Sequence, residues 1–180
     1  MKLKLTIFLI SLSMVCYSSM EVVAQEMNDD QVAEPEFAEP VSQEALYRIE
    51  VAEIISSNNP YNVDVEDITN RIVSICYLEY NQNPVIWTYI AFKENEYRTW
   101  EIGGAGERSI FQIHPVHKKK IKEYGLHWDD HDDLMRFGCC MVQERLDNGR
   151  TLYQAYKPWS VRYRAFQLYK KHQEEKKDGD

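Results

Sequence analysis

Glu94 is the residue of this sequence whose position best suits it to proton-transfer chemistry. It ends a strongly apolar run, in which Ile86, Ile90 and Ala91 precede it by eight, four and three residues. On a helix these positions share a face with Glu94, so its carboxyl group leans onto apolar side chains, and desolvation raises its pKa. A carboxylic acid that stays protonated near neutral pH can act as a general acid. Position alone also allows a plainer interpretation, a helix-end charge in solvent.

The residues after Glu94 extend this candidate site. Glu96 lies two positions further on, so it points to another side of the helix and cannot share a cleft with Glu94. Three of the seven glycines follow at positions 103, 104 and 106, where they permit a tight turn and a close approach of the backbone to a ligand. Gln112 then interrupts the apolar run SIFQIHP of residues 109–115. An amide at the edge of such a run can bind a neutral polar ligand such as a sugar.

Two predicted helices position Glu94. The first spans residues 64–80, where apolar side chains recur every four residues from position 68 onwards. Asp64 suits its N-cap, with Asp67 at the spacing of a capping box. The second spans residues 84–96, where Pro84 suits a first helical turn and dense apolar side chains predict burial on most sides. Residues 99–109 are expected to form a loop or a short irregular pair of strands.

Further helices are predicted on both sides of this pair. Residues 42–56 are a weak candidate that the Asn-Asn-Pro of residues 58–60 interrupts. Residues 115–124 form a helix that Gly125 closes, and Asp132 or Asp133 caps a helix that continues to about residue 147. Residues 152–156 and 159–171 complete the pattern. The sequence thus predicts a mainly α fold with a small loop or β region beside the candidate cleft.

The N-terminal part of the chain has a different composition. Two lysines, about a dozen apolar residues and a small-residue exit at Ala24 make residues 1–24 a predicted secretory signal peptide, with a retained anchor as the alternative. Residues 25–45 are acidic and predict a disordered tether, residues 46–172 the folded domain, and residues 173–180 a flexible tail. We therefore expect a periplasmic or secreted protein that meets a membrane only through an uncleaved signal.

Charge and residue types argue against some partners. Residues 25–67 hold twelve acidic residues and one basic residue, whereas residues 68–180 hold sixteen acidic and eighteen basic ones. Such a chain lacks the basic footprint of a nucleic-acid-binding protein. His114 with His117, and His127 with His131, have spacings compatible with metal ligands on a helix. No further motif supports such a site, so we predict neither a metal nor a cofactor.

Three cysteines, Cys76, Cys139 and Cys140, remain after the predicted cleavage. An exported protein meets an oxidising compartment, which allows a disulfide. The adjacent pair would bridge each other only with strain, so we predict a bridge from Cys76 to Cys139 or Cys140. Three small buried apolar side chains are the alternative.

Several motifs, taken in order, resemble one known family. IAFKENEY (90–97), GAG (104–106) and SIFQIHP (109–115) are similar to the catalytic helix end, glycine loop and Gly-Leu-Met/Phe-Gln-Ile-x-Pro segment of SLT-type lytic transglycosylases, which have the lysozyme-like fold. DLMRFG (133–138) and AYK (155–157) resemble the family's later Asn-Ile-x-x-Gly and Ala-Tyr-Asn motifs. The resemblance covers roughly residues 64–170. Asn95, Ser109 and Lys157 depart from it, since the family has Ser, Gly and Asn there.

The resemblance implies a lysozyme-like domain that cleaves the β-1,4 bond between N-acetylmuramic acid (MurNAc) and N-acetylglucosamine (GlcNAc) in peptidoglycan. Glu94 would be the catalytic residue, and Asn95, Ser109, Gln112 and Tyr156 would contact the substrate. Glu94 would protonate the glycosidic oxygen and then accept the proton of the MurNAc 6-hydroxyl, which closes a 1,6-anhydro ring. Because no water attacks, no second carboxylate is needed, in contrast to glycosidases that use two.

Two alternatives remain open. A hydrolysing lysozyme on the same scaffold would use Glu101 or Glu107 to position a water, and a non-catalytic peptidoglycan-binding module would use Glu94 for no reaction. Tyr97, Trp100 and Trp159 can stack on sugar rings, although core packing is the commoner role for such residues. An envelope-spanning secretion or conjugation apparatus is a further expected partner, and that expectation rests on analogy alone.

Overall fold

The computed structural model describes residues 40–179, and it confirms the mainly helical fold. Its elements, in chain order, are α1 (Gln43–Ser57), α2 (Val65–Ile72), the π-helix η1 (Val73–Glu79), α3 (Pro84–Asn95), the 3₁₀ helix η2 (Pro115–His117), α4 (Lys118–Glu123), α5 (His131–Asp147), α6 (Leu152–Ala155) and α7 (Arg162–Gly179). The predicted β region amounts, within residues 40–179, to one isolated antiparallel bridge between Arg108 and Ile113. The predicted signal peptide and most of the predicted tether lie outside the described residues.

Local capping chemistry sets the ends of several helices. The Asp64 carboxylate accepts a hydrogen bond from the Asp67 amide at 3.0 Å, as predicted for the start of α2. Gly125 follows α4 with φ +74°, and the next amide reaches back to the Ile121 carbonyl, which is the hydrogen-bond pattern of a Schellman cap. The cap of α5 differs from the prediction. Asp130 has the extended backbone of an N-cap and accepts from the two following aspartate amides, so Asp132 and Asp133 fall in the first turn.

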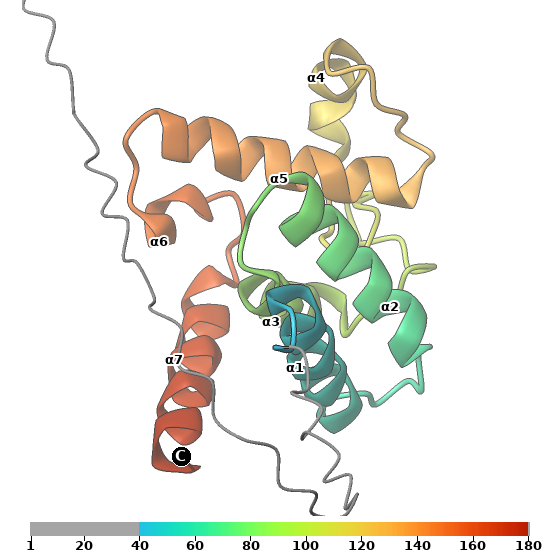
Figure 1. The fold of residues 1–180 in the computed structure, drawn as a ribbon. Helices are drawn as coiled ribbons and strands as arrows, with labels where there is room; N and C mark the ends of the chain where they lie inside the picture. The colour runs from blue at the N-terminus through green and yellow to red at the C-terminus, as the bar shows by residue number, and fades with distance from the viewer. Residues whose placement is uncertain (1–39, 180) are drawn as a thin grey trace, which may run out of the picture. The chain divides into compact units, whose positions relative to one another are not determined.

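Helix α3 lies at the centre of the domain and is buried on most of its sides, as its apolar sequence predicts. It packs against α1, α2, η1 and α7, and α5 crosses over the other helices in the upper part of Figure 1. Helix α2 continues into η1 without a break, a change of helical pitch that the regular apolar spacing did not reveal. Because α3 is held from so many sides, the backbone that carries Glu94 is firmly placed.

An aromatic cluster fills the space between α3, α5 and the segment before α7. The Trp87 ring stacks on Phe111 with centroids 4.3 Å apart, and Tyr156 and Trp159 each meet Trp87 edge-on at 5.0 Å. A Cβ on Gly138 of α5 would come within 3.3 Å of Phe111 and 3.4 Å of Trp87 and Trp159. A glycine in this helix therefore lets the rings pack directly against its backbone.

The two ends of the described chain meet through Glu50 of α1. Its carboxylate lies 2.8 Å from Nε2 of His172 and 3.0 Å from Nζ of Lys176, both on α7. Two predicted boundaries therefore change. Helix α1 begins at residue 43, inside the predicted tether, and α7 continues to residue 179 through the predicted tail. The start of α1 agrees with the helix candidate at residues 42–56, so only the tether boundary at residue 45 was misplaced. The extension of α7 was missed because the contacts of His172 and Lys176 with Glu50 join residues more than a hundred positions apart.

Two of the three cysteines lie close to each other in the fold. Sγ of Cys139 lies 3.5 Å from Sγ of Cys76 in the buried core, while Cys140 turns away and contacts the Tyr80 hydroxyl at 3.2 Å. All three thiols are free in the structure, so the predicted bridge is not formed. The geometry does identify Cys139 as the partner that Cys76 faces.

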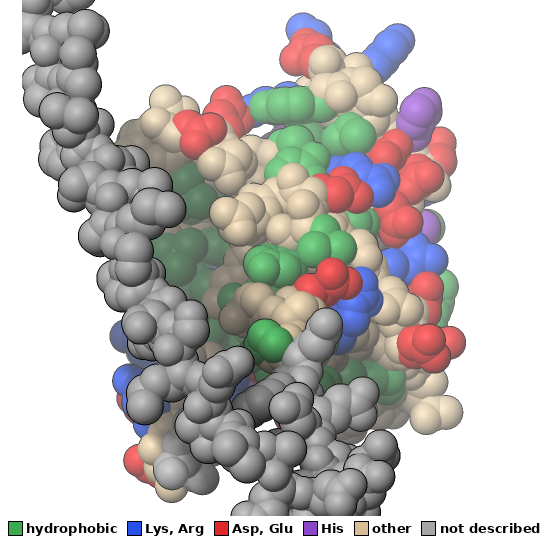
Figure 2. All heavy atoms as spheres, in the orientation of Figure 1, with side chains coloured by type: hydrophobic (Ala, Val, Ile, Leu, Met, Phe, Trp, Pro, Cys, Tyr) green, Lys and Arg blue, Asp and Glu red, His purple; other side chains and the backbone are tan. Residues whose placement is uncertain are grey.

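The surface carries charges of both signs. Figure 2 shows acidic and basic side chains intermixed on its right-hand side, in keeping with ion pairs such as Arg71 with Asp67 and Asp132, which tie α2 to α5. In the part of the chain that the structure describes, no helix is long and apolar enough to cross a membrane.

Candidate active-site cleft

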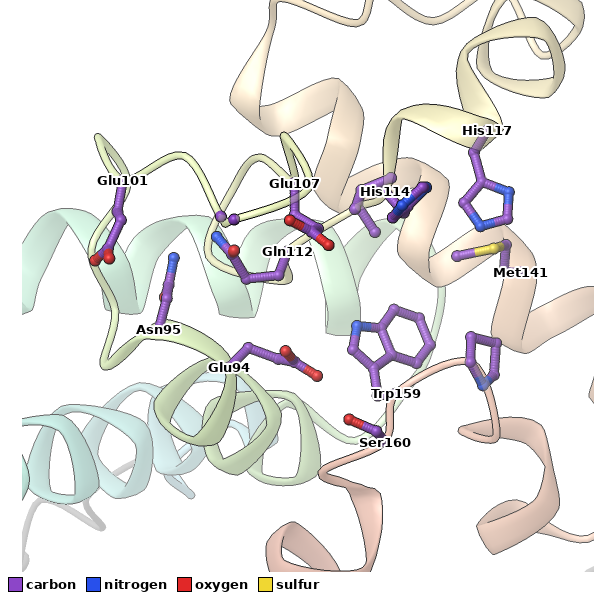
Figure 3. A pocket seen from close by; sticks show the side chains of 14 residues that line it. Glu94, Asn95, Glu101, Glu107, Gln112, His114, His117, Met141, Trp159 and Ser160 are labelled. Carbon is purple, nitrogen blue, oxygen red and sulfur yellow. The ribbon is translucent and has the colours of Figure 1, made fainter.

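A cleft of about 500 Å³ lies beside the C-terminal end of α3. Figure 3 shows Glu94 and Asn95 of α3 below, Glu101, Glu107 and Gln112 from the following loop above them, and Trp159 to the right of Glu94. His114, His117, Met141 of α5 and residues 158–160 continue the wall. Segments far apart in sequence thus meet around Glu94.

Glu94 is partly buried in this cleft and has no hydrogen-bond or ion-pair partner among residues 40–179. Burial, and after it the negative charge of Glu107, raises the pKa of Glu94 to about 7. This shift has the direction expected from the apolar helix face. At neutral pH the carboxyl group is therefore divided between its acid and base forms, as a group that both donates and accepts a proton requires.

Glu96 points away from the cleft, as its spacing predicts. It is the C-cap of α3, where the backbone enters the left-handed region with φ 55°. Its side chain lines a separate hollow, together with Phe92 and residues 56–60 that follow α1. Glu96 is therefore a natural control for Glu94.

The glycine-rich loop fits closely around Glu107 and Gln112. A Cβ on Gly103 would lie 2.4 Å from Oε2 of Glu107 and 2.5 Å from Oε1 of Gln112, so no larger residue fits there without displacing both side chains. Gly106 has φ +87°, a conformation that favours glycine. The Glu107 carboxylate accepts a hydrogen bond from the Ala105 amide at 2.9 Å. The loop therefore folds back and presents Glu107 to the cleft that contains Glu94.

Glu101 also reaches the cleft, but its carboxylate is paired with Arg98. Glu101 and Glu107 were singled out by sequence only for the hydrolytic alternative. Periodicity gave no indication that the loop would return Glu107 to Glu94, because this return depends on the close packing at Gly103.

Two predicted substrate contacts, Asn95 and Gln112, do line the cleft. Gln112 donates from Nε2 to the Ser109 carbonyl at 3.1 Å. Asn95 is buried and donates from Nδ2 to the carbonyls of Arg98, at 2.7 Å, and Ser109, at 3.2 Å. Asn95 thereby joins the end of α3 to the loop, and its Oδ1 is buried without a partner among the described residues.

The structure differs from the prediction at Ser109 and Tyr156, which do not line the cleft. Ser109 is fully buried and its hydroxyl donates to the His131 carbonyl at 3.3 Å. Tyr156 is fully buried in the aromatic cluster, and its hydroxyl has no partner within residues 40–179. The motifs pointed to the segment that holds each of these residues. The direction of each side chain is decided by packing against distant helices, which the motifs do not describe.

Of the three aromatic residues considered for sugar stacking, only Trp159 lines the cleft. Its indole Nε1 donates to the Phe111 carbonyl at 2.8 Å, which fixes the ring. Tyr97 is fully buried and stacks on Phe92, and Trp100 is largely exposed outside the cleft. Trp159 therefore belongs to the aromatic cluster and also forms part of the wall of the cleft.

The histidine pairs do not assemble into a metal site. In the described part of the chain, no group of three or more His, Cys, Asp or Glu side chains is placed to hold a metal ion. His127 instead lies 2.9 Å from the Asp133 carboxylate, and the pKa of His117 is lowered by burial and by the neighbouring His114 and Lys120.

No protein-family model matches this sequence, and neither a curated protein nor a solved structure matches it. The chemistry of the cleft must therefore be judged from its own residues. An acid with a pKa near neutrality and no partner in the described part of the chain, a fixed aromatic wall and the Gln112 amide are suited to proton transfer on a neutral polar ligand.

Proposed function

We propose that this chain is an exported, lysozyme-like lytic transglycosylase that cleaves the MurNAc–GlcNAc bond of peptidoglycan with formation of 1,6-anhydroMurNAc. The observation that carries the proposal is Glu94, an unpaired carboxyl group in a cleft with a pKa of about 7. The motifs of residues 90–97 and 109–115, which resemble the SLT-type family, contribute Asn95, Gln112, Ile113 and His114 to the wall of the cleft. The substrate is the peptidoglycan glycan strand, and the place of action is the periplasm or the exterior of the cell.

Backbone conformation supports the resemblance at one of its departures. The family has glycine where this chain has Ser109, and Ser109 has φ +69°, in the left-handed region that favours glycine. The chain thus keeps the turn of the motif with a different residue. Asn95, a second departure, is used as a structural anchor rather than as a free polar contact.

The proposed reaction uses Glu94 twice. Its protonated carboxyl group donates the proton to the glycosidic oxygen as the bond from that oxygen to C1 of MurNAc breaks. The resulting carboxylate then accepts the proton of the MurNAc 6-hydroxyl while the 6-oxygen bonds to C1, which restores the acid form of Glu94. Gln112 offers an amide to the sugar, and the Trp159 ring forms the wall beside Glu94.

Hydrolysis is the second candidate, and Glu107 is the observation that favours it. Its carboxylate faces the same cleft, is fixed by the Ala105 amide, and is close enough to raise the pKa of Glu94. In a two-carboxylate mechanism, Glu107 would hold a water for attack on C1. The lone acid on α3 therefore does not by itself decide between the two reactions.

Analysis of the cleavage products tests the proposal. Peptidoglycan digested by the purified protein should give muropeptides that end in 1,6-anhydroMurNAc, lighter by one water than hydrolysis products and without a reducing end. Products with reducing ends would contradict the lyase and make Glu107 the first residue to substitute. Retention on the wall without any product would indicate a binding module instead.

A further inference from the structure

The cleft continues into a second hollow with a different charge. This hollow, which we call the cationic chamber, has a volume of about 610 Å³ and shares His117, Met141 and Pro158 with the cleft of Glu94. Its remaining wall comes from α4, the C-terminal half of α5 and the turn after it. A ligand bound in the cleft can therefore extend into the chamber without leaving the surface.

The chamber is lined by three cations, Lys120, Arg145 and Arg150, and by one carboxylate, Glu144. Lys120 is committed to Glu144, since its Nζ lies 2.6 Å from Oε2 of that residue. Neither arginine has a carboxylate within 4.0 Å among residues 40–179. Two guanidinium groups are thus left to face the chamber.

Arg145 supplies a second, independent observation. Its Nε is buried and has no acceptor among the described residues. Buried N–H groups are nearly always hydrogen-bonded, because a buried donor without a partner loses its hydrogen bonds to water and gains no other. The terminal nitrogens of Arg145 are not among the buried atoms and make no side-chain hydrogen bond within residues 40–179, so they are the donors that an oxygen ligand in the chamber can reach. A carboxylate is the acceptor that a guanidinium binds best.

The other end of the groove has the opposite character. Within residues 40–179, the cleft of Glu94 is lined by three acidic side chains, Glu94, Glu101 and Glu107, and by no Lys or Arg. An anion would be repelled there and attracted to the chamber. The groove therefore suits an elongated ligand whose neutral part occupies the cleft and whose anionic part occupies the chamber.

We propose that the cationic chamber binds the carboxylates of the stem peptide that peptidoglycan carries on MurNAc, while the neutral sugars lie in the cleft. This assignment rests on the proposed function, because it takes the glycan strand as the ligand. The stem peptide is joined to the strand at the sugar and ends in free carboxylates, so it meets the requirement for a neutral part and an anionic part in one molecule. Arg145 and Arg150 are the recognition residues.

Binding measurements with two forms of one ligand test the assignment. The probes are soluble glycan strands with intact stem peptides and the same strands stripped of peptide by an amidase. The full chain carrying Glu94→Gln keeps the ligand uncut. We expect it to bind the peptide-bearing strand about tenfold more tightly than the stripped strand, the effect of one charge-assisted hydrogen-bonded pair.

The arginine variants then locate the effect. Arg145→Gln with Arg150→Gln, in the same background, should remove the preference and leave the affinity for the stripped strand unchanged. A matched control removes two positive charges outside the chamber, with Lys122→Gln and Arg164→Gln, both exposed, and should retain the preference. Arg150→Gln alone, at an exposed residue, reports on the chamber even where the double variant unfolds.

Equal affinity for both strands, or an equal loss for both strands in the arginine variants, would overturn the assignment. Cleavage by the unsubstituted protein is assayed separately. A preference for peptide-bearing strands without cleavage would support the chamber and contradict the proposed function. Cleavage without any such preference would do the reverse.

Discussion

Two glutamates of this domain, Glu50 and Glu94, are withdrawn from water in opposite ways. Glu50 is the more deeply buried, with 11% of its side chain exposed, and it holds two partners, His172 at 2.8 Å and Lys176 at 3.0 Å. Glu94 is partly buried and has no partner within the described residues, and its pKa rises to about 7. Depth of burial therefore does not set the pKa of a glutamate by itself. The proposed acid is distinguished by having no cation beside it among the described residues.

Physical chemistry gives the reason for this contrast. The Glu50 carboxylate has a histidine and a lysine within 3.0 Å, and these two contacts join α1 to α7. A carboxyl group desolvated without a cation is destabilised as an anion and holds its proton to higher pH. The first arrangement favours stability and the second favours proton transfer, so substitutions at the two sites should separate the two properties.

The largest effect is expected at the unpaired acid. Glu94→Gln keeps the shape of the side chain and removes its ionisable proton, so cleavage of peptidoglycan should fall by about 10²–10⁴-fold. Initial rates of muropeptide release measure this, with circular dichroism as the check on folding. Glu96→Gln, on the other side of the helix end, is the control and should retain activity. Equal losses in the two variants would refute the role of Glu94.

At the paired acid the effect should be on stability. Glu50→Gln leaves His172 and Lys176 without their carboxylate, but Lys176 is 55% exposed and keeps part of its hydration. We expect the free energy of unfolding to fall by about 1–3 kcal/mol, with cleavage unchanged where the fold persists. Urea titration measures it. Glu53→Gln, on the exposed side of α1, is the control and should leave the free energy of unfolding almost unchanged. A loss of cleavage in a folded Glu50→Gln variant would contradict a purely structural role for Glu50.

The pH dependence of stability and of cleavage should reflect the raised pKa of Glu94. The folded pKa of Glu94, about 7, lies above its ordinary value of 4.5, so the native state keeps the proton longer than the unfolded state. The contribution of Glu94 to stability therefore declines as pH rises from about 4.5 to 7. Cleavage, which needs the acid form, should decline about tenfold per pH unit above 7.

Glu107→Gln sharpens this prediction. It removes a negative charge that raises the pKa of Glu94, so the decline in cleavage should begin at lower pH. Glu101→Gln is the control, since the Glu101 carboxylate is paired with Arg98 and does not contribute to the shift. Initial rates measured over about five pH units, from about pH 4 to about pH 9, would show this shift in the decline of cleavage. A decline that stays in place in Glu107→Gln would mean that the two carboxylates do not interact.

A smaller effect is expected from the glycine loop. Gly103→Ala adds a Cβ that meets the Glu107 and Gln112 side chains, so it should displace both and lower cleavage by about tenfold. Gly104→Ala adds the same methyl group one residue further on, where nothing lies within 4 Å, and should be neutral. Similar rates in the two variants would show that the cleft tolerates movement of Glu107 and Gln112.

The smallest effect is predicted at Tyr156. Its hydroxyl is buried without a partner in the described part of the chain, so Tyr156→Phe should change the free energy of unfolding by less than about 1 kcal/mol and leave cleavage as it is. Thermal unfolding and initial rates measure both. A clear loss of cleavage would mean that the hydroxyl reaches the ligand after all, as the motif alone suggested.

The parts of the fold that follow from local chemistry were predictable. The cap at Asp64 and the glycine after α4 use hydrogen bonds within a few residues, and Pro84 suits a first turn because it has no N–H there to leave unpaired. The structure has all three. Glu94 was found in the same way, from the apolar face of its own helix. Each of these depends on neighbours that a reader of the sequence can see.

The parts that escaped prediction depend on contacts across the chain. Ser109 turns inward because its hydroxyl donates a hydrogen bond to the His131 carbonyl. Tyr156 is enclosed by the rings of Trp87, Trp159 and Phe166, which come from other segments. The approach of Glu107 to Glu94 requires the loop to close on Gly103. Periodicity contains no information on such pairings, so sequence named Glu101 or Glu107 for the hydrolytic alternative but could not tell which of them raises the pKa of Glu94.

The ion pairs of Glu50 also determine when the molecule can be completed during synthesis. Its two partners lie 122 and 126 residues further along the chain, in α7, which is synthesised after every other described helix. Closing so long a loop is also slower than forming local helices. A nascent chain can therefore assemble the residues around Glu94 first, but the Glu50 carboxylate of α1 has neither partner until α7 has been made. A chain cut short before α7 retains every residue of the cleft loop and lacks the two side chains that bind Glu50.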